Sequence, residues 1–121
     1  MAFKTISGIC EITTGEYSET LSAPVYQDEI CATLLSIDFT EDGSPFSVPG
    51  TAYVKFYYDG KYPDTADIEM TISGDNASLE LPAALTAISG KATAFITIID
   101  TGFTIVACEI PITIRGKYDG A

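Results

Sequence analysis

The sequence predicts an all-β domain, a single immunoglobulin-like antiparallel β-sandwich of about seven or eight strands. Apolar and polar residues alternate with a period of two in several segments, most clearly in residues 51–58 and 92–99. Turn-forming pairs such as Asp42-Gly43 and Gly74-Asp75 separate these segments. No segment has the 3.6-residue apolar period of an amphipathic helix.

The first third of the chain predicts two strands joined by a polar connection. The first covers residues 4–14, with Ile6, Cys10 and Ile12 pointing inward and Gly8 marking a β-bulge. Residues 14–22 are predicted as the connection, and residues 24–26 as an extended approach to the next strand. That strand covers residues 30–39, and one of its faces carries Cys31, Thr33, Leu35, Ile37 and Phe39.

The middle of the chain predicts a turn, a strong strand and a second, shorter strand. Residues 41–45 have turn composition, and Phe46 and Val48 are predicted to anchor the following segment. Residues 51–58 form the clearest strand, in which inward Ala52, Val54, Phe56 and Tyr58 alternate with outward Tyr53, Lys55 and Tyr57. A polar loop follows over residues 61–67. Ile68, Met70 and Ile72 then predict one further strand.

The last third predicts a short strand, a compact turn and a long hairpin. Ala77, Leu79 and Leu81 alternate until Pro82 ends the strand, and Leu85 and Ile88 are expected to cap the core. Ala92, Ala94, Ile96 and Ile98 share a face of the next strand, which Asp100-Thr101-Gly102 connects to residues 103–114. The return strand has Val106, Cys108, Ile110, Ile112 and Ile114 on one face. Pro111 within it indicates an edge or a bulge.

Composition excludes several classes of function. The chain has 121 residues and 46% hydrophobic residues, as expected of one folded domain. A net charge of −11 disfavours nucleic-acid binding, and the absence of a long apolar run disfavours a membrane span. The N-terminus lacks the apolar stretch of a signal peptide, so we expect the protein to be made in the cytoplasm. Cys10, Cys31 and Cys108 are expected to be small, buried and reduced, although a bridge between neighbouring strands stays open.

No catalytic, cofactor or metal site can be assembled from the sequence. Asp59, Asp64 and Asp67 surround a loop, but their spacing matches no EF-hand, and a solvated loop is the simpler interpretation. Asp38 and Asp100 fit separate turn roles better than a catalytic pair. The chain has no histidine, so no serine–histidine arrangement exists. We therefore expect a protein that is not an enzyme.

Four tyrosines are the candidate interface residues: Tyr53, Tyr57, Tyr58 and Tyr62. Outward aromatic side chains are enriched at protein interfaces and also stack on sugars. A second buried face or a covered edge would place the same residues inside the protein. The sequence leaves both interpretations open.

Several segments resemble the N-terminal domain of phage upper baseplate proteins (the BppU-like family). They are Tyr26-Gln27-Asp28, residues 42–46, residues 54–60, Leu79-Glu80-Leu81-Pro82, Leu85-Thr86-Ala87, Gly90-Lys91 and residues 96–100. The resemblance covers residues 24–115, which leaves an N-terminal strand over residues 1–14 and a polar tail over residues 116–121 of one domain. Two departures are Val48-Pro49-Gly50, where the family has Leu-Thr-Gly, and a chain that stops at Ala121.

The resemblance implies a virion structural protein that attaches to other capsid or tail subunits in multiple copies or as a homo-oligomer. Because the sequence lacks the family's helical extension, it fits a capsid decoration or head-fibre protein, or a small tail or baseplate adaptor. The alternative is a β-sandwich module that binds a carbohydrate or host receptor. Neither nucleic acid nor membrane is an expected partner.

Overall fold

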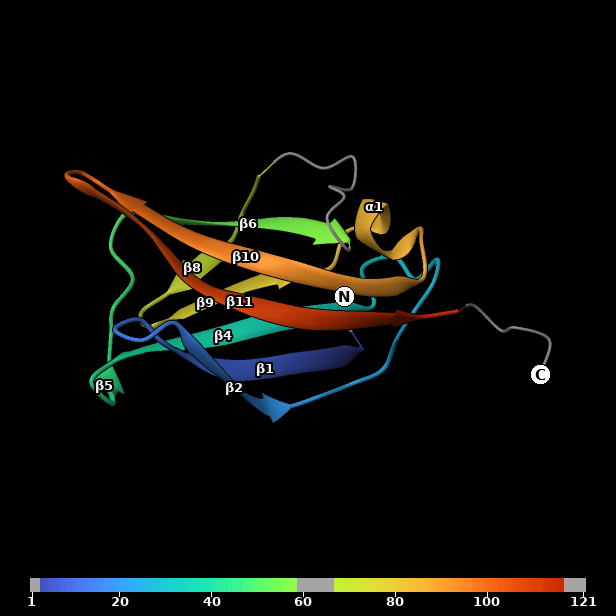
Figure 1. The fold of residues 1–121 in the computed structure, drawn as a ribbon, viewed down its shortest axis with the longest axis horizontal. Helices are drawn as coiled ribbons and strands as arrows, with labels where there is room; N and C mark the ends of the chain where they lie inside the picture. The colour runs from blue at the N-terminus through green and yellow to red at the C-terminus, as the bar shows by residue number, and fades with distance from the viewer. Residues whose placement is uncertain (1–2, 59–66, 117–121) are drawn as a thin grey trace.

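The computed structural model describes residues 3–58 and 67–116, and these form two β-sheets packed face to face with one short helix at an end (Figure 1). The helix α1 spans only Ala83–Thr86. The predicted all-β sandwich is therefore confirmed. Among the described residues, no helix has the length or apolar character needed to cross a bilayer.

Sheet A has the strand order β2-β1-β4-β9-β8, and β5 pairs with β4 beyond a turn. Its strands are β1 (Lys4–Glu11), β2 (Glu16–Leu21), β4 (Thr33–Glu41), β5 (Ser44–Pro45), β8 (Thr71–Ser73) and β9 (Asn76–Glu80). The pairing of β1 with β4 is parallel, although the sequence predicted an antiparallel sandwich. After β2 the chain crosses to the other sheet and then returns to sheet A at the end where β1 begins. β4 therefore runs in the same direction as β1.

Sheet B has the strand order β3-β11-β10-β6-β7. Its strands are β3 (Val25–Tyr26), β6 (Thr51–Tyr58), β7 (Ile68–Glu69), β10 (Gly90–Asp100) and β11 (Phe103–Arg115). The β10–β11 hairpin forms one long end of the molecule (Figure 1). The short strand β3 pairs with β11 in parallel, at Ile114 and Arg115 only.

One hydrophobic core lies between the sheets. Its largest fully buried side chains include Phe39 of sheet A and Phe56 of sheet B. The alternation predicted for β6 and β10 is confirmed, because Ala52, Val54, Phe56, Ala94, Ile96 and Ile98 are all fully buried. Leu85 of α1 is also fully buried and closes one end of the core. Burying side chains of this size contributes about 1.5–3 kcal/mol each.

Residues 14–22 are not a plain connection, because they contain the edge strand β2. Five of its six residues are exposed, so the strand has no apolar alternation to reveal it. The ladder to β1 shifts register between Ser7 and Gly8, which confirms the bulge predicted at Gly8. An exposed, charged and irregular edge strand is a common protection against strand addition.

The strand predicted from residue 30 begins three residues later, at Thr33. Cys31 adopts a positive φ of 53° and is exposed, so the expectation that it is buried is wrong. Ile30 is likewise 67% exposed. The loop before β4 must pass from sheet B to sheet A, and this turn breaks the alternation that the residue types suggest.

The single strand predicted over residues 68–72 is two strands in different sheets. β7 pairs with β6 in sheet B, and β8 pairs with β9 in sheet A. Met70 lies between them, is buried, and donates its backbone N–H to the carbonyl of Ala52. The chain therefore changes sheet at Met70, which closes that side of the sandwich.

Two apolar residues expected in the core are exposed. Val106 is 62% exposed because β11 has a bulge: Cys108 pairs with Ile96, and Val106 pairs with Thr97. The extra residue, Ala107, reverses the alternation on its N-terminal side. Ile88 is 57% exposed, because α1 ends before it and the buried residues of the helix are Leu85 and Thr86.

Candidate functional site

The two sheets present outward faces of different chemistry. The outward side of sheet A is rich in hydroxyl groups, as in Ser7, Ser36 and Ser78, and its charged residues are Glu11, Glu16, Asp38 and Glu80. Within the described ranges it carries neither Lys nor Arg. The outward side of sheet B carries tyrosine, phenylalanine and lysine instead. Aromatic enrichment marks the second face as the better candidate for a protein contact.

The candidate surface is a lattice of nine residues on three neighbouring strands, called here the aromatic face. β10 lies in the middle, between β6 and β11. The strand register defines three rows, which are Tyr53–Thr97–Val106, Lys55–Phe95–Glu109 and Tyr57–Thr93–Pro111. Alternation places all nine side chains on the side of the sheet away from the core.

Phe95 is the centre of this face. Its ring stacks on Tyr57, with centroids 4.7 Å apart and planes inclined by 12°. Such pairs add about 0.5–1.5 kcal/mol beyond the area they bury. The stack holds two aromatic side chains in fixed positions in the unbound protein. Binding a partner therefore costs less side-chain entropy at these two residues.

The remaining side chains of the face are partly accessible. Val106 is exposed, Pro111 is exposed, and Tyr53 is half-buried. Next to this lattice, Ile99 is 41% exposed and extends the apolar area toward the β10–β11 turn. Among the described elements, none packs on this side of sheet B (Figure 1).

Charge on the aromatic face is balanced, in contrast to the rest of the molecule. Lys55 and Glu109 flank Phe95 in the central row. The ammonium of Lys55 also lies 3.9 Å from the carboxylate of Asp67, at a site exposed enough for this pair to contribute little. Lys91 and Arg115 stand at one end of β10 and β11 on the same side. A chain with a net charge of −11 thus keeps three of its bases on one sheet.

The four candidate tyrosines are not brought together. Tyr53 and Tyr57 lie two rows apart on the aromatic face. Tyr58 points to the opposite side of β6 and is buried, and this burial raises the pKa of its hydroxyl group. Tyr62 lies outside the described residues. The aromatic face therefore has Tyr53 and Tyr57 in common with the sequence prediction.

Phe95, Val106 and Pro111 complete the face and were not among the candidate residues. The alternation of β10 already indicates that Phe95 points outward, but its contact with Tyr57 depends on the register between strands far apart in sequence. The position of Val106 depends on the bulge at Ala107, which lies four residues before Pro111, the residue at which the sequence indicates an edge or a bulge.

The residues considered for metal binding or catalysis are dispersed. Asp59 and Asp64 lie outside the described residues, and Asp67 pairs with Lys55. Asp38 accepts a hydrogen bond from the side chain of Asn76 on sheet A, whereas Asp100 ends β10 on sheet B. Within residues 3–58 and 67–116, no three His, Cys, Asp or Glu side chains are grouped as metal ligands would be.

The cysteines are free in the structure. Cys10 and Cys108 are buried and face each other from the two sheets, where the thiol of Cys10 donates to the carbonyl of Ala107 over 3.1 Å. A hydrogen bond with Cys10, followed by burial, raises the pKa of the Cys108 thiol. A neutral buried thiol is a poor nucleophile, so this pair is part of the core packing.

These observations define the chain as a two-sheet β-sandwich with one aromatic, charge-balanced outward face. Its fold is similar to that of the N-terminal domain of phage TP901-1 ORF48, with a TM-score of 0.64 over 94% of this chain and 98% of that one. The two sequences are 7% identical, so the likeness is one of fold. No family model matches the chain, and no curated protein matches it.

Proposed function

We propose that this protein is a non-catalytic structural component of a bacteriophage virion, attached to other virion subunits through its aromatic face. The observation that carries the proposal is the fold, which a phage protein domain shares over nearly the full length of both chains. The sequence resemblance to phage upper baseplate proteins supports the same class. A capsid decoration or head-fibre protein and a tail or baseplate adaptor are both consistent with this role.

The aromatic face supports attachment by contact. Tyrosine is over-represented among the residues that contribute most to binding, and phenylalanine is enriched at interfaces. Here the two lie at the centre of a sheet surface. The opposite outward face is covered by hydroxyl and carboxylate groups, which keep a surface solvated. An assembly contact is therefore better placed on sheet B.

Replacing Tyr53 and Tyr57 together with serine tests the proposal. The side chains point away from the core, so the fold should remain, with a loss of roughly 1 kcal/mol from the Tyr57–Phe95 stack. The copy number of the variant in purified phage particles, measured by quantitative mass spectrometry, should fall well below that of the wild type.

The matched control is Ile9→Ser, which removes a partly exposed apolar side chain from the outward face of sheet A. This variant should enter particles at the wild-type level. If the double tyrosine variant folds and still reaches the wild-type copy number, the aromatic face is not the attachment surface.

A further inference from the structure

We propose that the virion subunit bound by the aromatic face is a second copy of this chain, which contributes its own aromatic face to a dimer with a two-fold axis along β10 through Phe95. The inference deepens the proposed function, since it rests on the aromatic face being a contact surface and names one partner for it. It is carried by the register of the three strands and by the charges that this register places around Phe95.

The lattice of side chains is self-complementary about β10. A two-fold axis lying along the middle strand, in the plane between two facing sheets, places β6 of one copy against β11 of the other. Lys55 then faces the second copy's Glu109, and Glu109 faces its Lys55. Phe95 meets its own symmetry mate.

The two outer rows match in the same operation. Tyr53 faces the second copy's Val106, and Tyr57 faces its Pro111. Both are contacts between an aromatic ring and an aliphatic side chain, which suit a packed interface as long as each tyrosine hydroxyl group reaches solvent at its rim. The small Thr93 and Thr97 lie on the axis and leave room for the larger side chains of the neighbouring strands.

Charge selects this axis over the other face-to-face arrangement. A two-fold axis across the strands would place Lys55 on Lys55 and Glu109 on Glu109, and like charges in contact cost binding energy. The same argument disfavours contact between two copies of sheet A, whose outward charges in the described residues are all negative. Two molecules with a net charge of −11 therefore approach with least repulsion through sheet B.

The size of the face indicates a weak dimer. Three strands spaced by about 4.8 Å and eight residue steps of about 3.4 Å, which extend the three rows to Lys91 and Ile99 on β10, give roughly 400 Å² on each copy, about half of a standard interface. Sheet twist restricts the best match to the three central rows. Lys91, at the end of β10, meets its own symmetry mate, but its long side chain can turn into solvent.

Charge reversal of Lys55 and Glu109 tests the arrangement on the purified full-length protein. Sedimentation equilibrium over roughly 10 µM to 1 mM should show a monomer–dimer equilibrium for the wild type, the range expected for an interface of this size. Lys55→Glu and Glu109→Lys should each weaken association at least tenfold, because each variant places like charges together. Glu16→Lys on sheet A is the control for the second substitution and should leave association as in the wild type.

The reciprocal contact gives a sharper outcome. An equimolar mixture of Lys55→Glu and Glu109→Lys should form a heterodimer, since every charged pair between the two variants is then of opposite sign. The double variant Lys55→Glu/Glu109→Lys keeps the wild-type net charge and should dimerise again. Thermal unfolding checks that each variant is folded.

A wild-type protein that stays monomeric up to about 1 mM would overturn the dimer. The proposed axis would be wrong if neither Lys55→Glu nor Glu109→Lys weakens dimerisation. It would also be wrong if mixing these two variants fails to restore dimerisation. Incorporation into virions is a separate measurement. If the protein is monomeric but needs Tyr53 and Tyr57 to enter virions, the dimer is wrong and the proposed function stands. If the protein dimerises but enters virions without these tyrosines, the proposed function is wrong.

Discussion

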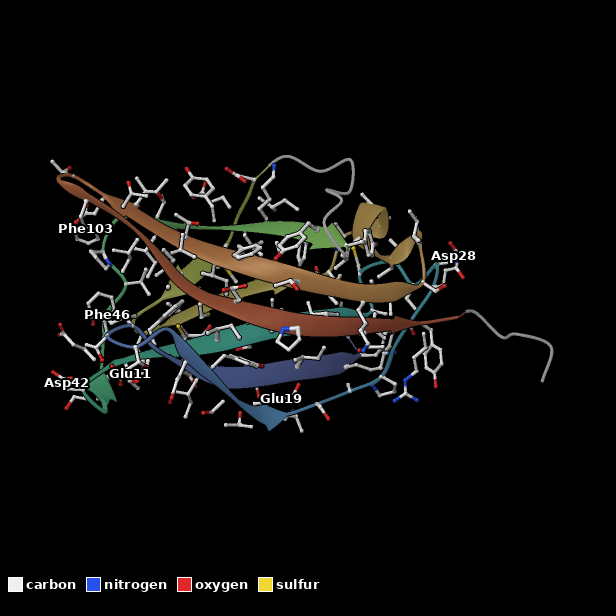
Figure 2. All side chains as sticks on the ribbon, viewed as in Figure 1. Glu11, Glu19, Asp28, Asp42, Phe46 and Phe103 are labelled. Carbon is white, nitrogen blue, oxygen red and sulfur yellow. The ribbon has the colours of Figure 1, made fainter. Side chains whose placement is uncertain are left out.

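The Glu11 side chain stabilises the turn between β4 and β5. Its carboxylate accepts hydrogen bonds from the hydroxyl group of Thr40 at 2.8 Å and from the backbone N–H groups of Asp42 at 2.9 Å and Gly43 at 3.0 Å. Asp42 and Gly43 both have positive φ, and the Glu11 side chain lies beside Asp42 at this end of the sandwich (Figure 2). A carboxylate on the neighbouring strand satisfies both donors.

Protonation of Glu11 should destabilise the protein at low pH. Hydrogen bonds from Thr13, Gly43 and Thr40 lower the pKa of Glu11 from 4.5 to about 2. A lowered folded-state pKa contributes stability that is complete above the unfolded value and is lost as the pH falls toward 2. The unfolding midpoints of the wild type and of Glu11→Gln should therefore converge between about pH 5 and pH 2. A constant difference over this range would contradict the role of the carboxylate.

The exposure of the three cysteines predicts their reactivity. Cys31 is exposed in a left-handed turn, whereas Cys10 and Cys108 are buried. A thiol-alkylating reagent should modify one residue of the native protein quickly and all three after unfolding without reductant. Peptide mass spectrometry should place the native modification at Cys31. Two thiols protected after unfolding would show a disulfide, and fast native labelling of Cys10 would show that the sheets open.

At the scale of elements, β1 and β2 fit together around a glycine. The Tyr17 ring of β2 covers Gly8 in β1, and a Cβ atom at position 8 would overlap that ring. Burial of this ring, together with the negative charge of Glu19, raises the pKa of Tyr17 to about 12. Tyr17 thus closes the side of the sandwich where β2 approaches β11.

Gly8→Ala should destabilise the protein by about 1–3 kcal/mol, the usual cost of forcing extra volume into a packed site. The cost should be smaller in a Tyr17→Ala background, where the overlapping ring is absent. A double-mutant cycle from denaturant unfolding measures the difference. Additive costs would show that Gly8 is needed for its backbone conformation and not for space.

The sequence predicts the central elements of this fold better than its edges. β6 and β10 have an inward face made almost entirely of apolar residues, so alternation alone places Phe56 and Ile96 correctly. Five of the six residues of β2 are exposed and Tyr17 alone packs toward the core, so nothing in the composition of β2 distinguishes it from a loop. The exchange of sheets at Met70 leaves the alternation intact, so one strand and two strands look alike in sequence.

The sequence likewise predicts one part of the aromatic face and not the rest. Local alternation is enough to predict that Tyr53 and Tyr57 point outward. It is not enough to predict that Tyr57 stacks on Phe95, because that contact joins strands almost forty residues apart. The rows of the face are a property of pairing register, and register is set by turns and bulges that single residues do not reveal.

At the scale of the whole molecule, the proposed function and the chemistry of the two outward faces together predict how the protein is oriented on a virion. Sheet A presents hydroxyl and carboxylate groups, and sheet B presents aromatic groups with Lys55 and Lys91. If sheet B is the contact surface, sheet A should face solvent. Single cysteines at Ser18 on β2 and at Thr97 on β10, introduced into a Cys31→Ser background, report on the two faces.

In the dilute isolated protein both introduced thiols should react with a maleimide, because both side chains lie on outward faces. In intact particles the thiol at position 18 should react at a similar rate, whereas the thiol at position 97 should react at least tenfold more slowly, since a packed interface excludes the reagent. For each thiol, the maleimide reaction rate in particles is divided by the rate in the isolated protein. This ratio removes the difference in reactivity that the two sites already have in the isolated protein. Equal ratios would mean that sheet B is open to solvent on the virion, and stronger protection at position 18 would mean that the protein attaches through sheet A.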